Sequence, residues 1–243
     1  MDKKASVEVI IPIYNEEAEL ELNIVKLYSF LENNLSAYTW HITIADNAST
    51  DKSLIIAKDL AGKLTNVGFI HFDQKGRGGA VKNVWKKSKA EILAYMDIDL
   101  STDLSNFLPL LTHLENDYDI AIGSRLLAKS RVDNRTLKRE ILSRGYNILI
   151  RFAFGTHFSD AQCGFKAVTR AVVIELLPNI VDNAWFFDSE LLIVGEKTGF
   201  KIYEQPVNWV DNPGSTVRVM KTIYGDLAGL WRLFWTRPWK KYE

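Results

Sequence analysis

Cysteine is almost absent from this 243-residue chain, which contains Cys163 alone. A single cysteine excludes an intramolecular disulfide framework and a cysteine-rich zinc site, and it fits a reducing compartment. An excess of one charge is also missing, because 30 Lys and Arg residues offset 30 Asp and Glu residues. A net charge of zero argues against a dedicated nucleic-acid-binding protein, which normally carries a basic surplus.

Long apolar segments are missing as well. No uninterrupted apolar run is long enough to span a bilayer, and residues 1–6 lead into a short apolar strand without the apolar segment of a signal peptide. The composition is otherwise that of a packed globular protein, with 47% apolar and 25% charged residues, which rules out a disordered chain.

Short apolar runs alternate with helical patterns through the first half of the chain. The runs predict five strands, at Val7–Ile13, Trp40–Ala45, Val67–Phe72, Ile92–Met96 and Asp119–Ile122. Strands that alternate with helices predict an α/β protein with a mainly parallel twisted sheet and helices on both faces.

After residue 130 the pattern changes. An apolar stripe at helical spacing consists of Leu137, Ile141, Ile148 and Phe152. Residues 185–197 predict another helix, residues 201–210 a strand, and residues 219–235 an aromatic-rich helix. In the absence of a repeat or a linker, we expect a single domain over residues 1–243, with 219–243 as a C-terminal amphipathic helix and tail.

Polar residues follow each of the five predicted strands. They are Asn15 and Glu16, Asp46 and Asn47, Asp73 to Lys75, Asp97 and Asp99, and Ser124 and Arg125. Polar residues end strands in many proteins, so one such position says little. Five that converge on one edge of a parallel sheet predict a site there, because ligands bind at the carboxyl ends of the strands.

Asp97 and Asp99 are the candidate metal ligands. They directly follow an apolar strand, and residues two apart in an extended segment face the same side. Two carboxylates on one side can hold Mg2+ or Mn2+, hard cations that prefer oxygen ligands and share them with substrate phosphates.

The turn Lys75–Gly79 opens a predicted helix with three glycines around Arg77. Glycines let a backbone approach a phosphate, a helix N-terminus favours an anion, and Arg77 adds a positive charge. A plain flexible turn is the alternative. The glycine spacings of the dinucleotide-binding fingerprint and of the P-loop are absent, which argues against a Rossmann dehydrogenase and a P-loop kinase.

Further basic candidates are Arg125, Arg218 and Lys221, and Arg139 shares a helix face with Ser143. Solvated surface charge is the alternative, and we prefer it for Lys221. The four histidines show no metal-ligand spacing. Cys163 has no obvious base partner, so we expect a small packed residue rather than a nucleophile.

Several motifs resemble those of inverting glycosyltransferases of the GT-A fold. They occur in the order seen in that family, at residues 12–16 (PIYNE), 46–51 (DNASTD), 76–80 (GRGGA) and 97–99 (DID). In the second half, residues 160–166 (DAQCGFK), 185–190 (WFFDSE) and 206–209 (PVNW) resemble the polyprenyl-phosphate glycosyltransferases. Within these, the sequence is most similar to the dolichyl-phosphate beta-glucosyltransferase type.

The resemblance implies roles for individual residues. The donor nucleoside would be held by Pro12, Tyr14, Asn15, Glu16 and Asp46, and the diphosphate by Arg77. Asp97 and Asp99 match the pair that binds Mg2+ or Mn2+, with Gln162 as a further metal ligand. The acceptor phosphate would be held by Arg125, Arg139, Ser143 and Arg218. The expected catalytic residues are Asp97, Asp99, Arg125 and Arg218.

Two departures from the family pattern concern the nucleoside site. Many relatives have two adjacent acidic residues after the second strand, and Ala45 stands in place of the first, which leaves Asp46 alone. Asn47 replaces a usual glycine.

The resemblance implies a metal-dependent enzyme that transfers glucose from UDP-glucose to a polyprenyl or dolichyl phosphate with inversion. Metal and Arg77 would neutralise the charge that develops on the leaving nucleoside diphosphate. The acceptor oxygen is already anionic near neutral pH, so no general base is needed. Asp188 and Glu190 could orient sugar hydroxyls, or they could be polar helix residues that cover the site.

Three alternatives stay open. Mannosyl transfer from GDP-mannose would use the same acceptor class. A sugar-phosphate nucleotidyltransferase would share the sheet, but a glycine-rich loop with a basic residue should stand where residues 12–16 are. A non-catalytic nucleotide-sugar-binding module would not need both an acidic pair and a basic acceptor set.

The last helix predicts a contact with a membrane. Its apolar stripe consists of Val219, Ile223, Leu227, Leu230 and Phe234, joined by Trp231, Trp235 and Trp239. Aromatic residues flanked by cations mark helices that lie in the headgroup region, so we expect a cytoplasmic protein, peripheral at the cytoplasmic face of a membrane. The alternative is that this stripe packs on the domain. The oligomeric state stays open.

Overall fold

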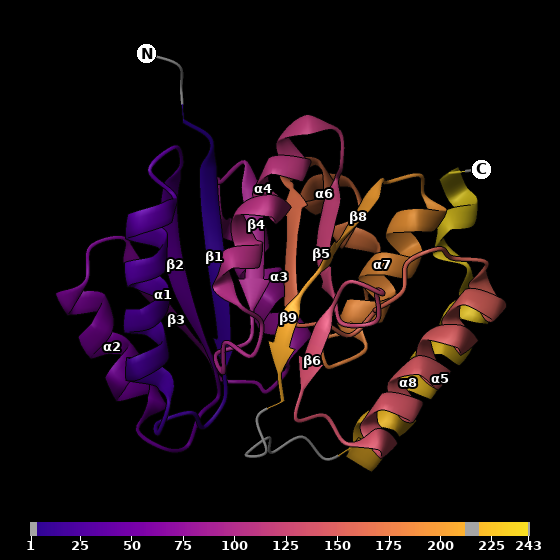
Figure 1. Cartoon of the computed structure of the whole chain (residues 1–243), viewed down its shortest axis with the longest axis horizontal. Helices are drawn as coiled ribbons and strands as arrows, with labels where there is room; N and C mark the ends of the chain where they lie inside the picture. Colours follow the sequence, from indigo (N-terminus) through magenta and orange to yellow (C-terminus); the bar gives the residue numbers. More distant parts are fainter. Residues whose placement is uncertain (1–3, 212–218, 243) are drawn as a thin grey trace.

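A seven-stranded sheet forms the centre of the computed structural model, which describes residues 4–211 and 219–242 (Figure 1). The strand order is β3-β2-β1-β4-β7-β5-β8. The bounds are β1 Ser6–Ile13, β2 Thr39–Asn47, β3 Val67–Phe72, β4 Ile92–Met96, β5 Ile120–Ser124, β7 Phe165–Thr169 and β8 Ile202–Pro206. Neighbouring strands are parallel except where β7 pairs with β4 and β5. The mainly parallel sheet and the five predicted strands of the first half are confirmed.

The strand predicted over residues 201–210 is wrong as a single element. The segment forms β8 in the main sheet and then β9 (Asn208–Val210), which pairs in parallel with β6 (Arg131–Asp133) in a separate two-stranded sheet. Pro206 ends β8, because proline has no backbone N–H to continue a ladder.

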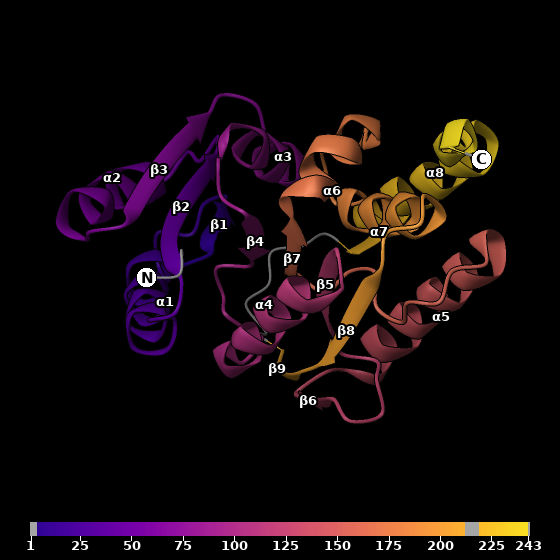
Figure 2. The same ribbon diagram turned by 90° about the horizontal axis from the view of Figure 1, so that it is seen from above.

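Helices cover both faces of the sheet (Figure 2). On one face lie α1 (Leu20–Asn34), α2 (Ser53–Lys63) and α4 (Phe107–Asn116), and on the other α3 (Arg77–Lys87), α6 (Arg170–Glu175) and α7 (Phe187–Lys197). In β1, Val9 and Ile11 belong to the core under α1, α2 and α4, and Ile10 between them belongs to the core under α3, α6 and α7. Because successive side chains point to opposite faces, a strand buried on both faces carries a continuous apolar run.

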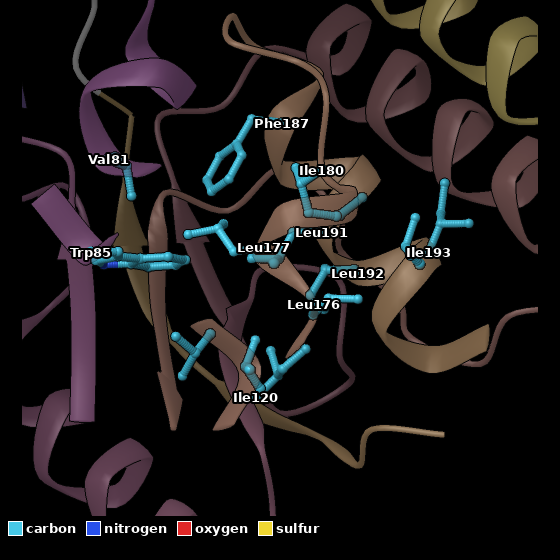
Figure 3. Close-up of a cluster of buried hydrophobic side chains, with 14 of the residues drawn as sticks. Val81, Trp85, Ile120, Leu176, Leu177, Ile180, Phe187, Leu191, Leu192 and Ile193 are labelled. Carbon is cyan, nitrogen blue, oxygen red and sulfur yellow. The ribbon is translucent and has the colours of Figure 1, made fainter. Parts of the chain in front are cut away.

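The core under α3, α6 and α7 fixes the position of one end of α7. Val81 and Trp85 of α3 lie in one cluster with Leu177, Phe187 and Leu191 (Figure 3). The rings of Trp85 and Phe187 meet edge to face with centroids 5.9 Å apart. This packing places the first turn of α7 against α3.

Two longer helices, α5 (Leu137–Phe154) and α8 (Val219–Thr236), lie beyond the β8 edge and contact each other (Figure 1). Three short 3-10 helices, η1 (Leu104–Asn106), η2 (Leu177–Asn179) and η3 (Pro238–Tyr242), complete the described elements. None of the helices in the described ranges is long and apolar enough to cross a membrane.

The apolar stripes of these two helices differ in where they face. In α5 all four stripe residues are exposed, from Leu137 to Phe152, which is 91% exposed. The α8 stripe is divided between the two alternatives, because part of it packs on the domain and part of it is exposed. Leu230 and Trp239 are buried together with Leu233, whereas the exposed members are Leu227, Trp231, Phe234 and Trp235. The side chain of Val219 lies outside the described part of the chain.

Candidate active site

The carboxyl ends of β1, β2 and β4 meet at one edge of the sheet and carry the predicted donor and metal residues. Glu16 after β1 lies near enough to Asp97 and Asp99 after β4 for both carboxylates to raise its pKa. Asp46 at the end of β2 contacts His71 of β3, with Oδ2 2.5 Å from Nδ1. The structure therefore brings residues from four strands to one edge.

Asn15 connects the loop after β1 to the turn after β2. Its φ of 55° is a left-handed conformation that Asn adopts more readily than most residues. Its Oδ1 accepts a hydrogen bond from the Thr50 backbone N at 2.8 Å. Nearby, the Lys75 ammonium lies 3.2 Å from the centre of the Tyr14 ring. Tyr14 and Asn15 are accessible at this loop, whereas Pro12 is buried within β1.

The turn after β2 contains a residue with a left-handed backbone. Ala48 has a φ of 61°, the conformation that favours glycine, whereas Asn47 still belongs to β2. Ala48 is therefore the residue of this turn whose backbone conformation suits a glycine. Asp46 and Asn47 are the last two residues of β2 and form an adjacent polar pair at its carboxyl end, after Ala45.

Asp46 and Asn47 are both buried, and each has a defined partner. Asp46 Oδ2 contacts His71, and its Oδ1 has no hydrogen-bond partner among the described residues. Asn47 Oδ1 accepts the Gly76 backbone N at 2.6 Å. Asp46 Oδ1 is thus a buried acceptor at the end of β2 without a partner among the described residues.

The carboxylates near Asp97 repel one another in a way that a cation would relieve. Burial and the neighbouring carboxylates raise the pKa of Glu16 to about 7, and burial together with Asp97 raises the pKa of Asp99. In the described ranges no three His, Cys, Asp or Glu side chains form a complete metal cage. Two carboxylates without a cage fit Mg2+ or Mn2+, which take remaining ligands from water and substrate phosphates.

Arg77 is held between two carboxylates. Its Nη2 lies 2.5 Å from Asp97 Oδ1, and its Nη1 lies 2.7 Å from Asp188 Oδ2. Burial opposes the charged form, but Asp97 and Asp188 outweigh it and hold the pKa of Arg77 above its ordinary value. The guanidinium also lies 5.1 Å from the Trp185 ring centre. Arg77 is therefore a fixed positive charge beside the candidate metal pair.

Asp188 has further buried partners that the sequence analysis did not identify. Its Oδ1 accepts hydrogen bonds from Tyr95 and from Lys166 Nζ, the latter at 2.9 Å. Burial raises the pKa of Asp188 to about 6 and lowers the pKa of Lys166 to about 7. Lys166 is the second residue of β7, and nothing in the neighbouring sequence indicates that its ammonium is buried, so only its partner reveals its position.

The glycines before and in α3 serve packing against another loop. The backbone N–H groups of Gly78 and Gly79 donate to the carbonyls of Ala184 and Asn183 at 3.2 and 3.0 Å. A Cβ on Gly78 would lie 2.4 Å from the Cβ of Phe187. These two N–H groups are occupied, so the interpretation of this turn as a phosphate cradle is wrong for them.

One of the predicted acceptor residues, Arg125, lines a pocket of about 590 Å³, and α5, which carries Arg139 and Ser143, contributes Leu137, Glu140 and Arg144 to the same pocket. Its lining includes Arg125, Leu126, Leu127, Ala128, Ser130, Val132, Arg135, Leu137, Glu140 and Arg144. Arg139 pairs with Asp211 at 2.5 Å, and the buried Ser143 Oγ has no partner among the described residues. Arg218 lies outside the described residues, as does the side chain of Lys221.

Arg125 forms a buried ion pair with Asp160. Its Nε and Nη2 donate to the two carboxylate oxygens at 2.8 and 2.9 Å. Burial alone would raise the pKa of Asp160, but Arg125 holds it down to about 2. Arg125 also lies over the Trp209 ring, with its guanidinium carbon 5.4 Å from the ring centre.

Arg135 is a pocket residue that the sequence analysis missed. Its side chain is 7% exposed, its Nη1 donates to Glu140 at 2.9 Å, and its Nε has no partner among the described residues. Burial and the nearby Arg125 lower its pKa. Its sequence signal was a basic residue just before a helix, which does not distinguish a buried arginine from an exposed one.

Three other residues from the sequence analysis have defined surroundings in the structure, namely Gln162, Glu190 and Cys163. Gln162 Nε2 donates to Asp226 Oδ2 of α8 at 2.7 Å. Burial and nearby carboxylates raise the pKa of Asp226 to about 7. Glu190 is fully buried and accepts Asp182 N at 2.6 Å, so it holds a loop in place. Cys163 is buried, which raises its pKa to about 11 and agrees with a packed thiol.

A family model described as "Glycosyl transferase family 2" matches residues 8–177. Glycosyltransferase AglD of Haloferax volcanii is 33% identical over 94% of this chain, which spans 37% of that protein. The dolichyl-phosphate beta-glucosyltransferase ALG5D of Trichomonas vaginalis is 30% identical over 89% of this chain and 69% of its own length. The dolichyl-phosphate beta-glucosyltransferase of Saccharomyces cerevisiae is 30% identical over 88% of this chain and 70% of its own length.

Solved structures show the same fold. Glucosyl-3-phosphoglycerate synthase from Mycobacterium tuberculosis, in complex with Mn2+, UDP and phosphoglyceric acid, superimposes with a TM-score of 0.69. The match covers 95% of this chain and 79% of that chain, at 18% identity. The GT-A fold expected from the sequence motifs is confirmed.

Proposed function

Because this chain belongs to glycosyl transferase family 2, we propose that it transfers glucose from UDP-glucose to a dolichyl or other polyprenyl phosphate with inversion. The observation that carries the proposal is the pairing of two sites in one chain. Asp97, Asp99 and Arg77 lie at the sheet edge, and a pocket lined by arginines and leucines lies beyond β5. The names of the yeast and protist relatives agree with this acceptor and sugar.

The donor would lie along the sheet edge. Asp46 and Tyr14 would contact the uridine, and Arg77 would contact the diphosphate; support comes from the unpaired Oδ1 of Asp46 and from the position of both residues at the ends of β1 and β2. Mg2+ or Mn2+ held by Asp97 and Asp99 would supply positive charge to the leaving diphosphate. Because Arg77 is already anchored by two carboxylates, it adds its charge without first having to order its side chain.

The acceptor would lie in the arginine pocket. Arg125, Arg135 and Arg144 supply cations that suit a phosphate, and Leu126, Leu127 and Leu137 supply an apolar wall that suits the start of a prenyl chain. Arg139 and Ser143 lie on the same helix as Arg144. An anionic phosphate oxygen attacks without a general base, so these residues hold the nucleophile and need not remove a proton.

We propose that α5 and α8 lie on the membrane that holds the lipid acceptor, at its cytoplasmic face. Both helices expose large apolar side chains, including Ile141, Phe152, Trp231 and Trp235. Leu137 belongs to this exposed surface and also lines the arginine pocket. A prenyl chain could therefore pass from the bilayer into the pocket without crossing open water.

The test of the reaction is transfer of radiolabelled glucose from UDP-glucose to dolichyl phosphate in detergent with Mn2+. Asp99→Asn should lower the rate roughly 100-fold or more, the scale of losing one strong electrostatic contribution. Asp59→Asn, which changes an exposed carboxylate on α2, is the matched control and should keep the rate. Greater thermal protection by GDP than by UDP would favour the mannosyl alternative, and protection by neither would refute the donor site.

The membrane contact has a separate test. Phe152→Asp should lower cosedimentation with vesicles of phosphatidylcholine and phosphatidylglycerol, because it puts a charge at the most exposed apolar position of α5. Ile55→Asp, at an exposed apolar position on α2, is the control. Equal loss in both variants, or in neither, would contradict this orientation.

A further inference from the structure

A carboxylate occupies the inner face of α8, where apolar residues are expected. Asp226 is 3% exposed, and Leu230 and Leu233 on the same face are also buried. Gly229 lets this face approach α7 closely, because a Cβ there would lie 2.2 Å from the Phe186 ring. Asp226 therefore faces the protein interior beside the start of α7.

Only one of the two oxygens of Asp226 has a partner among the described residues. Oδ2 accepts Gln162 Nε2 at 2.7 Å, and Oδ1 is buried with no hydrogen bond. The charged groups that act on it most are Asp188 and Asp182, which are carboxylates and cannot compensate its charge. A buried carboxylate oxygen without a partner is costly, so such a group needs an explanation beyond packing.

Two chains of contacts connect Asp226 to the candidate donor site. Through Gln162 it joins the segment that ends at Gly164, whose carbonyl accepts the Asp97 backbone N at 3.0 Å. Through the electrostatic interaction with Asp188 it lies near the carboxylate that anchors Arg77. Both routes lead to Asp97, so short chains of contacts link Asp226 to the residues expected to hold the donor.

We propose that Asp226 binds the hexose of the nucleotide-sugar donor and accepts a hydrogen bond from a sugar hydroxyl with Oδ1. This inference rests on the proposed function. Gln162 holds the other oxygen, which orients the carboxylate before the donor arrives. The last helix then has two faces with two tasks, since its outer face carries exposed aromatics and its inner face contributes a sugar ligand.

The experiment compares UDP with UDP-glucose, because UDP lacks the sugar. Affinities for both are measured by calorimetry with Mn2+ for the wild type and for Asp226→Asn, which keeps the size of the side chain. The variant should bind UDP-glucose about 10- to 100-fold more weakly, the range for a hydrogen bond to a charged group, and UDP within about twofold of the wild type. Tyr146→Phe, which removes the nearby bond to Ser189 and keeps the carboxylate, is the control.

Donor analogues identify the hydroxyl and exclude a merely structural role. One of the monodeoxy UDP-glucose analogues should bind the wild type more weakly than UDP-glucose does, by the same factor of about 10 to 100. The same analogue should bind Asp226→Asn no more weakly than UDP-glucose binds that variant. Asp226→Ser, which keeps an oxygen at reduced size, provides the same comparison if the Asn variant does not fold. Equal weakening of UDP and UDP-glucose would overturn the inference and leave the proposed function intact. Failure of the wild type to bind either nucleotide would refute the proposed function itself, and the inference with it.

Discussion

Replacing Asp160 by Asn would test the buried ion pair beside the arginine pocket. Asp160 is fully buried, and Arg125 donates to it from its backbone N, its Nε and its Nη2 at 2.8–3.0 Å. Asp160→Asn keeps the shape of the side chain and removes its charge. The guanidinium of Arg125 would then remain largely buried without an anion.

The size of the effect follows from the pKa of Asp160. Arg125 lowers it from an ordinary value of 3.8 to about 2, and at 1.36 kcal/mol for each pKa unit the ionised form gains about 2 kcal/mol on folding. The variant also leaves a buried cation unpaired, and breaking a buried pair costs roughly 3–5 kcal/mol. We expect Asp160→Asn to lower the free energy of unfolding at pH 7 by roughly 3–5 kcal/mol.

The ion pair of Arg125 and Asp160 also predicts how the loss of unfolding free energy in Asp160→Asn, the stability deficit, changes with pH. Between pH 4 and pH 2 the unfolded chain binds the proton on Asp160 and the folded chain does not, so the contribution is complete above about pH 4 and is lost as the pH falls toward 2. Urea unfolding followed by tryptophan fluorescence at pH 7 and pH 3 measures both values. The difference between wild type and variant should shrink by about 1 kcal/mol at pH 3.

Asp59→Asn is the matched control, because it breaks an exposed pair with Lys63. Its cost should be far smaller than that of Asp160→Asn and should not follow the same pH dependence. A variant at Asp160 as stable as this control, or a deficit that is the same at pH 7 and pH 3, would refute the reasoning.

Three further predictions concern the sheet edge. Ala48→Gly should raise the free energy of unfolding by up to about 1 kcal/mol in urea, because Ala48 has a left-handed backbone, and a loss of stability would contradict that conformation. Gly164→Ala should abolish thermal protection by UDP with Mn2+ while the protein still folds, because the added Cβ would lie 1.8 Å from Asp97 Oδ2 and displace that carboxylate. Gly62→Ala is the control and should retain the protection, because no atom lies within 4 Å of its added Cβ. Excess chelator should remove the protection by UDP in the wild type, and added Mg2+ or Mn2+ should restore it; full protection in chelator would count against a metal at Asp97.

Local periodicity was enough to place most of the sheet and its polar edge. The runs of β1 and β4 are continuous because both faces of these strands are buried, and that pattern is visible residue by residue. Asp97 and Asp99 could be located because they directly follow such a run. The sequence therefore predicted the strands, their alternation with helices and the edge where the site lies.

Long-range contacts decided the features that the sequence did not reveal. The position of β7 between β4 and β5, antiparallel to both, depends on pairings with residues tens of positions away. A stripe of the same spacing is exposed in α5 and partly buried in α8, since spacing defines a helix face without saying what the face meets.

The partners of charged residues were likewise invisible to the sequence. Arg125 pairs with Asp160, 35 positions later, and Gln162 meets Asp226 across 64 positions. Nothing in a basic or acidic residue's neighbours indicates whether its side chain will be buried or which opposite group it will meet. The sequence determined the elements and the chemical groups available at their ends, and the tertiary structure determined which of those groups are paired and which are left to bind a ligand, because only folding brings distant segments within hydrogen-bonding distance.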